Sequence, residues 1–211
     1  MSLTAKEVTV CNQACDRIGA ANFTYAVQTS IVALKCNTHY EPTRDALLRS
    51  HDWPFARARK TLSAETNTPD FEWDYQFSLP DDYLRTRPLY RDNDNFQMDE
   101  PSKRCAIEGN KLMCNDETFD LKYIRKVTDP DEFDPLFKEV LVLQIALKLV
   151  HPVAGTEATS LKEGIMKELN ILMPQVRAVD RQEMNTSGYS SWNLARFTPL
   201  GIATNNYPQD T

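Results

Sequence analysis

The sequence predicts an α+β protein: mainly an α-helical bundle, with an inserted small antiparallel β subdomain and an extended C-terminal arm. Apolar residues recur at helical spacing near both ends of the chain, alternate with polar residues in its middle, and lose any period after Ser187. The predicted divisions are a helical part at 1–60, a β insert at 61–128, a second helical part at 129–186 that packs on the first, and the arm at 187–211.

The composition excludes several classes of protein. The chain has 211 residues, 41% of them hydrophobic, and a formal net charge of −6. An acidic balance argues against tight, sequence-independent binding to nucleic acid, which needs an excess of Lys and Arg. No apolar run reaches the roughly 18 residues of a membrane span, and the first residues lack the apolar core of a signal peptide. We therefore expect no membrane association and no export by a signal of its own.

The first helix is predicted from signals at both ends. Thr4 and Glu7 have the spacing of a capping box, in which each side chain accepts a hydrogen bond from the other's backbone N–H. Gly19 stands where a helix commonly ends in a left-handed residue. Between them, one apolar stripe is formed by Val8, Cys11, Cys15 and Ile18. This stripe predicts a packing face.

A second helix is predicted from a cap at Thr29 or Ser30 to about His51. Pro42 removes one backbone hydrogen bond inside it, which predicts a kink or a break into two pieces. His51 stands beside Asp52, as a general base stands beside the carboxylate that orients it. No Ser or Cys nucleophile can be assigned to the pair, so a structural histidine is the favoured interpretation.

The middle of the chain has strand periodicity. Residues 71–78 alternate aromatic and polar side chains, residues 83–90 form a further extended segment, and residues 121–127 are the last strand candidate. Gly109 and Asn110 predict the tight turn of a hairpin between 105–108 and 111–114. The aromatic stripe suits a sheet core better than a base-stacking platform, because acidic residues separate the rings. Residues 61–134 hold 18 acidic and 9 basic residues, which predicts a solvated, acidic β surface.

Helices return after residue 128. Asp134 and Pro135 form an N-cap followed by a proline at the first helical position. The helix that follows is apolar on nearly every face and leaves a spare face for a neighbouring subunit, until His151 and Pro152 end it. A last helix is predicted at 159–184, with Pro174 as a second kink candidate. The 25 residues from Ser187 hold isolated large apolar side chains without a period, which fits either an arm ordered by a partner or a tail packed on its own domain.

No residue pattern predicts a cofactor, a metal or catalysis. Phosphate-binding glycine loops, H-E-x-x-H and G-x-S-x-G are absent from the sequence. The five cysteines are an odd, scattered set, which favours reduced thiols in a cytosolic compartment. Cys11 with Cys15 and Cys36 with His39 share helical faces, but buried thiols are favoured over a zinc site because no C-x₂-C pair repeats.

Seven short segments, in their order and spacing, support a family assignment. They are I-G-A at 18–20, Y-E-P-T-R-D-A-L-L-R at 40–49, W-P-F-A at 53–56, L-P-D-D-Y-L-R at 79–85, V-T-D-P at 127–130, F-D-P-L-F at 133–137 and S-W-N-L-A-R at 191–196. Together they resemble the head-to-tail adaptor proteins of short-tailed bacteriophages, often called tail tubular protein A. The resemblance runs through Arg196, and residues 197–211 fall outside it.

The resemblance implies a structural virion protein of the tail or neck, made in the host cytoplasm, without enzymatic activity or cofactor. It implies a dodecameric ring that joins the portal protein to the tail nozzle protein, carries tail fibres and extends the DNA channel. It also implies a helical bundle with a β insert, and a C-terminal segment that reaches along the portal. Twelve copies would carry a strongly negative charge that repels DNA, so we expect genomic DNA to pass without specific binding.

Two sets of contact residues follow as hypotheses. The expected portal-binding residues are Trp192, Leu194, Arg196 and Phe197. The expected nozzle-facing residues of the β insert are Asp92, Asn93, Asp94 and Asn95. The alternative function is a soluble nucleic-acid-binding regulatory or packaging factor, acting through residues such as Arg57, Arg59 and Lys60.

Overall fold

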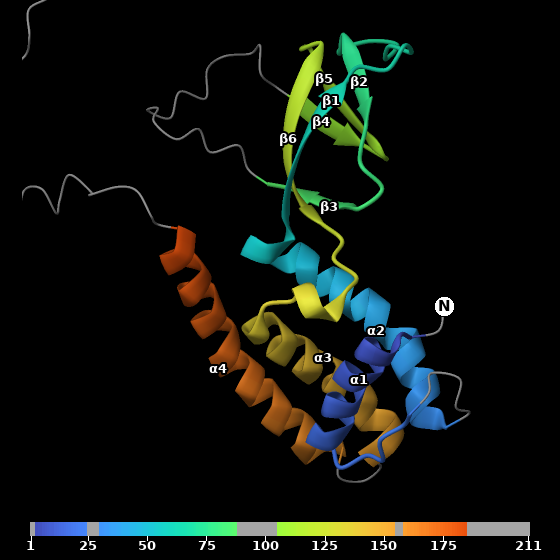
Figure 1. The fold of residues 1–211 in the computed structure, drawn as a ribbon, viewed down its shortest axis with the longest axis vertical. Coiled ribbons are helices and arrows are strands. Elements are labelled where there is room, and N and C mark those ends of the chain that lie inside the picture. Colours follow the sequence, from blue (N-terminus) through green and yellow to red (C-terminus); the bar gives the residue numbers. More distant parts are fainter. Residues whose placement is uncertain (1–2, 25–29, 88–104, 155–157, 185–211) are drawn as a thin grey trace, which may run out of the picture.

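The computed structural model describes residues 3–24, 30–87, 105–154 and 158–184, and it shows an α+β fold. The helices occupy one end of the molecule and two small antiparallel sheets occupy the other (Figure 1). The proposed arm at 187–211 lies outside the described residues. The helical part is built from segments on both sides of the β insert.

Helix α1, Ala5–Arg17, has both of its predicted ends. Glu7 N donates to Thr4 Oγ1 over 3.4 Å and Thr4 N donates to Glu7 Oε2 over 2.8 Å, which closes the capping box. Gly19 has a φ of +67°, the left-handed conformation that glycine adopts without strain. These are local contacts, which is why the sequence predicts them.

Helix α2, Ile31–Ser50, is capped by Ser30 and runs through Pro42 without interruption. Of the two outcomes predicted at Pro42, the break into two pieces is therefore wrong. Proline costs the helix one hydrogen bond, but Tyr40 and Leu47 on either side of it are buried in the helical core. Packing on both sides of the proline holds the helix together.

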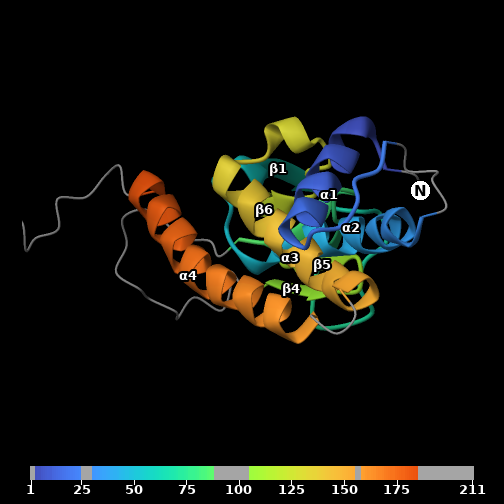
Figure 2. The same cartoon turned by 90° about the horizontal axis from the view of Figure 1, so that it is seen from below.

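Helix α3, Pro135–Ala154, lies at the centre of the bundle and contacts α1, α2 and α4 (Figure 2). Asp134 caps it, since its Oδ1 accepts from Leu136 N at 2.8 Å. It continues two residues past Pro152, so His151 and Pro152 do not end it. Its apolar faces are covered by helices of the same chain, and no neighbouring subunit is needed to bury them. Of the helices that the structure describes, none has the length and apolarity of a bilayer-spanning segment.

Helix α4, Ala158–Met184, packs along α3 and passes through Pro174 without a break. Its inward stripe includes Ile165, Leu169 and Val176. Only this stripe is covered, so α4 lies as a flank on the bundle and leaves an outer face exposed (Figure 2).

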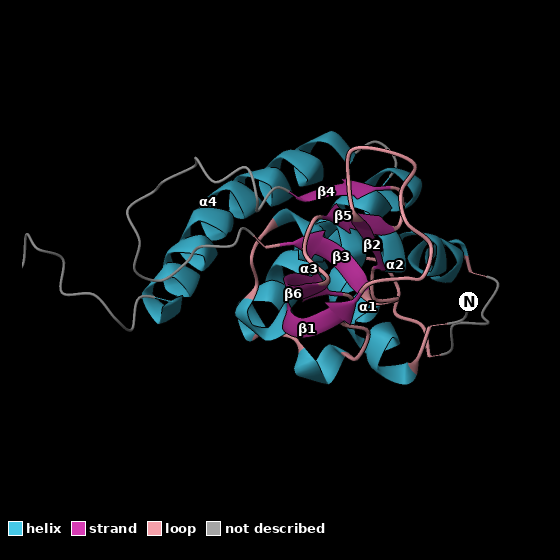
Figure 3. Ribbon diagram, turned by 90° about the horizontal axis from the view of Figure 1, so that it is seen from above, coloured by secondary structure: helices cyan, strands magenta, loops and turns pink. Residues whose placement is uncertain are grey.

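Six strands form two three-stranded sheets of antiparallel pairs (Figure 3). The first sheet has the order β1–β6–β3, from Arg57–Ser63, Thr118–Arg125 and Tyr83–Thr86. The second has the order β2–β5–β4, from Tyr75–Ser78, Lys111–Cys114 and Cys105–Glu108. Gly109, with a φ of +60°, makes the predicted turn between β4 and β5.

The observed strands differ from their predicted bounds at several points. β1 begins at Arg57, before the expected boundary at residue 61. Its apolar residues are only Ala58 and Leu62, so no apolar stripe marks it in the sequence. The aromatic alternation forms a strand only at Tyr75–Ser78: Glu72 has a φ of +71°, which no strand accommodates, and Phe71 is 79% exposed. The last strand is Thr118–Arg125, so it begins three residues before the predicted start and ends two residues before Val127. β3 ends at Thr86, inside the extended segment predicted at 83–90.

The two ends of the molecule have separate hydrophobic cores. The larger core joins all four helices and includes Trp53 and Ile124. The smaller one lies between the sheets and includes Leu62, Phe77 and Leu121. Two 3₁₀ turns, η1 at Pro54–Ala56 and η3 at Pro130–Glu132, adjoin the strands β1 and β6 where the chain passes between the helices and the sheets.

Candidate functional site

The contact residues expected from the resemblance lie outside the described residues. This holds for both sets, Trp192, Leu194, Arg196 and Phe197 in the arm and Asp92, Asn93, Asp94 and Asn95 in the insert. The site that the structure does define is the junction where the helices meet the sheets.

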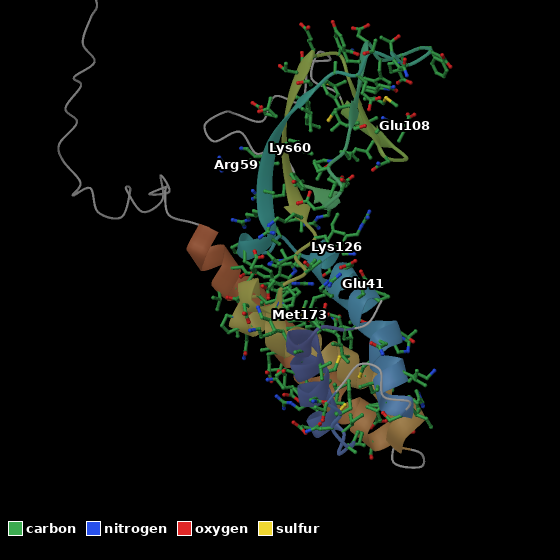
Figure 4. All side chains as sticks on the ribbon, turned by 45° about the vertical axis from the view of Figure 1, so that its right-hand side comes forward. Glu41, Arg59, Lys60, Glu108, Lys126 and Met173 are labelled. Carbon is green, nitrogen blue, oxygen red and sulfur yellow. The ribbon has the colours of Figure 1, made fainter. Side chains whose placement is uncertain are left out.

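One side of the junction is an ion-pair cluster between α2 and the segment that follows β6. Lys126 Nζ lies 2.9 Å from Glu41 Oε1 and 3.0 Å from Asp45 Oδ2 (Figure 4 labels Lys126 and Glu41). The hydrogen bond from Lys126 lowers the pKa of the Glu41 carboxyl, and the same bond raises the pKa of Lys126. Because Lys126 follows directly on β6, these pairs fix the sheet to α2.

Arg44 extends this cluster into the helical core. Its guanidinium is almost fully buried, with Nε donating to Asp45 Oδ1 at 2.8 Å and NH1 lying 3.5 Å from Glu7 Oε1. Arg44 also lies over the ring of Tyr40. One cation therefore links α1 and α2 at the point where Lys126 attaches the insert.

The other side of the junction contains the histidine that the sequence places beside Asp52. The two side chains do not form a dyad. His51 Nε2 lies 2.7 Å from Asp180 Oδ2 of α4, while Asp52 pairs with Arg57 at 3.2 Å and with Arg87 at 2.7 Å. Burial raises the pKa of Asp180, and the hydrogen bond from His51 opposes that shift. His51 also packs edge-on against Trp53, with ring centroids 4.9 Å apart.

Aromatic rings fill the space beneath this junction. Trp53 is buried, donates its indole N–H to Leu47 O at 2.9 Å, and packs edge-on against Phe137 with ring centroids 4.9 Å apart. Phe55 contacts Phe133 and Phe137 in turn. This ring cluster joins the start of β1 to the start of α3.

Three of the thiols lie in the helical core. Cys11, Cys15 and Cys36 are buried together between α1 and α2, and all five cysteines are free. A hydrogen bond with Cys11 is the main cause that raises the pKa of Cys36 to about 12, and burial of the thiol also raises it. Within the parts of the chain that the structure describes, no group of three or more His, Cys, Asp or Glu side chains is placed to hold a metal ion.

Apolar side chains on the outside of the helical part offer contact surface. Ile31 and Leu34, one turn apart at the start of α2, are 62% and 54% exposed. Ile171 on the outer face of α4 is 64% exposed. Scattered apolar residues are normal on a protein surface. Ile31 and Leu34 at the start of α2, and Ile171 on the outer face of α4, are nevertheless large side chains that a neighbouring chain can bury.

The basic residues of the alternative function divide between two faces of one strand. Arg57 and Arg59 share a face of β1, whereas Lys60 belongs to the other face, opposite the buried Leu121 (Figure 4 labels Arg59 and Lys60). The sequence shows these three residues as one run, and only the strand separates them.

Comparison with known proteins adds no assignment. A scan against protein-family models finds no match, and a search of curated proteins finds no significant one. The function must therefore be argued from the residues and their arrangement.

Proposed function

We propose that this protein is a structural virion component, a head-to-tail adaptor of a short-tailed bacteriophage. In this proposal, twelve copies form a ring that joins the portal to the tail nozzle and extends the DNA channel. Two things support it: the ordered resemblance of seven sequence segments, and an architecture with two separately packed ends joined by a fixed junction.

The junction is the observation that carries the proposal. A protein that bridges two components must hold its two contact surfaces in a defined relation, and two domains joined by a flexible linker do not do so. Here the insert leaves and re-enters the helical part through the paired strands β1 and β6, and Lys126 and Arg57 form ion pairs at its base. The two ends are thereby held as one body.

Three of the seven segments that carry the resemblance meet at this junction. Residues 40–49 supply Glu41 and Arg44, residues 53–56 supply Trp53, and residues 133–137 supply the phenylalanines that contact it. They are far apart in sequence but form one structural unit. Three of the resembling segments thus lie where the two ends are joined, and this supports a bridging role.

The proposed contacts divide between the ends. The arm at 187–211 follows α4 and would engage the portal, through Trp192 and Arg196 in particular. The β insert would face the nozzle, with the loop at 92–101 as its contact. Ile31, Leu34 and Ile171 are the candidates for contacts between neighbouring copies in the ring.

The test is reconstitution with a portal. The purified chain is mixed with the portal protein of the same phage, and the product is imaged by negative-stain electron microscopy. We expect a ring of twelve copies on the portal. The proposal is overturned if the chain stays monomeric in the presence of intact portals, at protein concentrations well above those at which the ring should assemble.

Two variants separate the roles of the ends. Deletion of 187–211 should leave a folded protein, by circular dichroism, that no longer binds the portal. Replacement of 92–101 by a Gly/Ser linker of equal length should leave the ring intact and abolish nozzle attachment. Portal binding by the first variant, or loss of the ring in the second, would contradict this division.

A further inference from the structure

The first sheet has one strongly basic face. Arg57 and Arg59 of β1 share this face with Lys122 of β6, because Cα partners in an antiparallel pair point to the same side and Arg59 is the partner of Lys122. Arg85 is the partner of Ile124, and Arg87 N donates to Lys122 O at 2.9 Å, which places both arginines on the same side from β3. We call these five residues the basic face.

Two cations of the basic face, Arg59 and Lys122, lie directly opposite each other on paired strands. Like charges directly opposite each other across two strands destabilise a sheet. Among the described residues, Arg59, Lys122 and Arg85 have neither an ion pair nor a side-chain hydrogen bond to a carboxylate. Asp120, the nearest acidic residue along β6, instead accepts from Thr61 Oγ1 at 2.7 Å. An acidic protein thus retains a local excess of positive charge at an electrostatic cost.

Asp52 organises the lower edge of this face. Its Oδ1 lies 3.2 Å from Arg57 Nε and 2.7 Å from Arg87 Nε. One carboxylate between two guanidinium groups leaves net positive charge and holds both side chains in fixed positions. Arg57 Nη2 also donates to Asp52 O at 3.2 Å. Because each Arg carries five N–H groups, Asp52 does not use all the donors of the two guanidinium groups.

The rest of the face indicates which anion it suits. Its apolar residue, Ile124, is fully buried under the helical part, so the exposed area lacks the apolar centre of a protein–protein interface. It also has no aromatic side chain on which an unpaired base could stack: its remaining positions are Thr61, Ser63, Thr118 and Asp120. Cations and hydroxyls repeated across three strands suit an anionic surface that is itself repetitive.

We propose that the basic face binds the phosphate backbone of double-stranded DNA, without reading its sequence. Phosphate contacts need only positive charge and hydrogen-bond donors, and they let a protein slide along the duplex. With about three phosphates neutralised and a net charge of −6, the binding is weak and sensitive to salt. This inference goes beyond the proposed adaptor function, because neither the ring nor the portal contact requires it.

The experiment measures binding of the full chain to a fluorescein-labelled 30-base-pair duplex of mixed sequence, by anisotropy, between 25 and 200 mM NaCl. We expect a Kd of about 10⁻⁴ to 10⁻⁶ M at the lower salt concentrations, and a slope of log K against log[NaCl] of about −3. The variant Arg59→Glu/Lys122→Glu should weaken binding by at least about tenfold and reduce the slope by about 2.

Lys162 and Lys167 provide the matched control, because both are exposed on α4, away from the sheets. Lys162→Glu/Lys167→Glu changes the net charge by the same amount and should keep most of the binding. Arg59→Gln/Lys122→Gln guards against misfolding, since it removes the opposed charges and should melt no lower than the wild type while losing affinity. No binding at 25 mM NaCl, or equal losses in the two charge-reversal variants, would overturn the proposal.

Polyglutamate of similar charge, used as an unlabelled competitor, distinguishes a protein partner from DNA. We expect unlabelled duplex to displace the labelled duplex at a far lower concentration of negative charge than polyglutamate needs. The reverse order would overturn the proposal in favour of an acidic polypeptide as partner. The adaptor function is tested separately: rings formed on the portal by Arg59→Glu/Lys122→Glu would leave that function intact whichever way the DNA measurement falls.

Discussion

His51 Nε2 and Asp180 Oδ2 lie 2.7 Å apart and join the end of α2 to the last turns of α4. The carboxylate is almost fully buried, at 5% exposure, although α4 is otherwise a flank of the bundle. Buried charges in proteins are paired, because an unpaired one costs several kcal/mol. This contact therefore fixes the position from which the chain continues into residues 185–211.

The first prediction concerns the pH dependence of this pair. Burial raises the pKa of Asp180 above its usual 3.8, so the folded state holds this proton more tightly than the unfolded state. The corresponding stability is present below pH 3.8 and is lost as the pH rises through the folded pKa. Asp180→Asn keeps an oxygen acceptor for His51 and cannot ionise. We expect the Tm of the variant, relative to wild type, to increase between pH 3 and pH 6. Asp70→Asn, at an exposed carboxylate, should show no such trend.

The second prediction concerns the junction. Lys126→Met removes both ion pairs to α2, which are partly exposed, so we expect a loss of about 1 kcal/mol or less in the free energy of unfolding. Lys126 lowers the pKa of Glu41, so this stability is present above the usual pKa of 4.5 and is lost as the pH falls through the folded pKa. Urea denaturation at pH 7 and pH 3 should show the larger effect at pH 7. Lys6→Met, at a more exposed lysine that also pairs with two carboxylates, should have a smaller effect.

The third prediction concerns two tyrosines with opposite expectations. Tyr40 is fully buried, and its Oη has no hydrogen-bond partner among the described residues. Tyr40→Phe should raise the free energy of unfolding by about 1 kcal/mol, because the desolvated hydroxyl is removed. Tyr123 Oη donates to Asp82 Oδ1 at 3.0 Å, and Tyr123→Phe should lower it by about 1 kcal/mol. Effects of the same sign in the two variants, measured by urea denaturation, would contradict this account.

The fourth prediction concerns thiol reactivity. Cys105 is exposed, whereas Cys11, Cys15, Cys36 and Cys114 are buried. Ellman's reagent should modify one thiol per chain under native conditions and five in urea, because a buried thiol neither ionises nor meets the reagent. Partial desolvation of its sulfur nevertheless raises the pKa of Cys105, so its reaction should be slower than that of free cysteine. In Cys105→Ser the native reaction should disappear, and a second fast thiol would show that the α1–α2 cluster is open.

Local contacts are what the sequence could predict. The caps at Thr4 and Asp134 involve partners within a few residues, so their side chains and spacing were sufficient. β1 could not be predicted in full, because the strand depends on pairing with β6, far along the chain, and not on an apolar pattern of its own. Pro42 shows the converse: a strong local signal was overruled by packing on both sides of it.

The same distinction applies to the site. His51 could be singled out from the sequence, but its partner is Asp180, 129 residues away, and not its neighbour Asp52. Arg57 and Arg59 were visible as a basic run, yet only the register of β1, β6 and β3 adds Lys122, Arg85 and Arg87 and sets Lys60 apart. Long-range register carries information that spacing along the chain does not.

Strands β1 and β6 begin and end the insert side by side, since Arg57 is the partner of Ile124. The insert of some seventy residues therefore connects to the helical part as a hairpin loop would, because its two ends lie next to each other. Replacing the residues between that pair by another module would remove the small core between the sheets, the Arg87–Asp52 ion pair and the contact of Leu84 with the helical core. A scaffold of this kind can acquire a new docking specificity by exchange at one point, while its helices continue to fold as before.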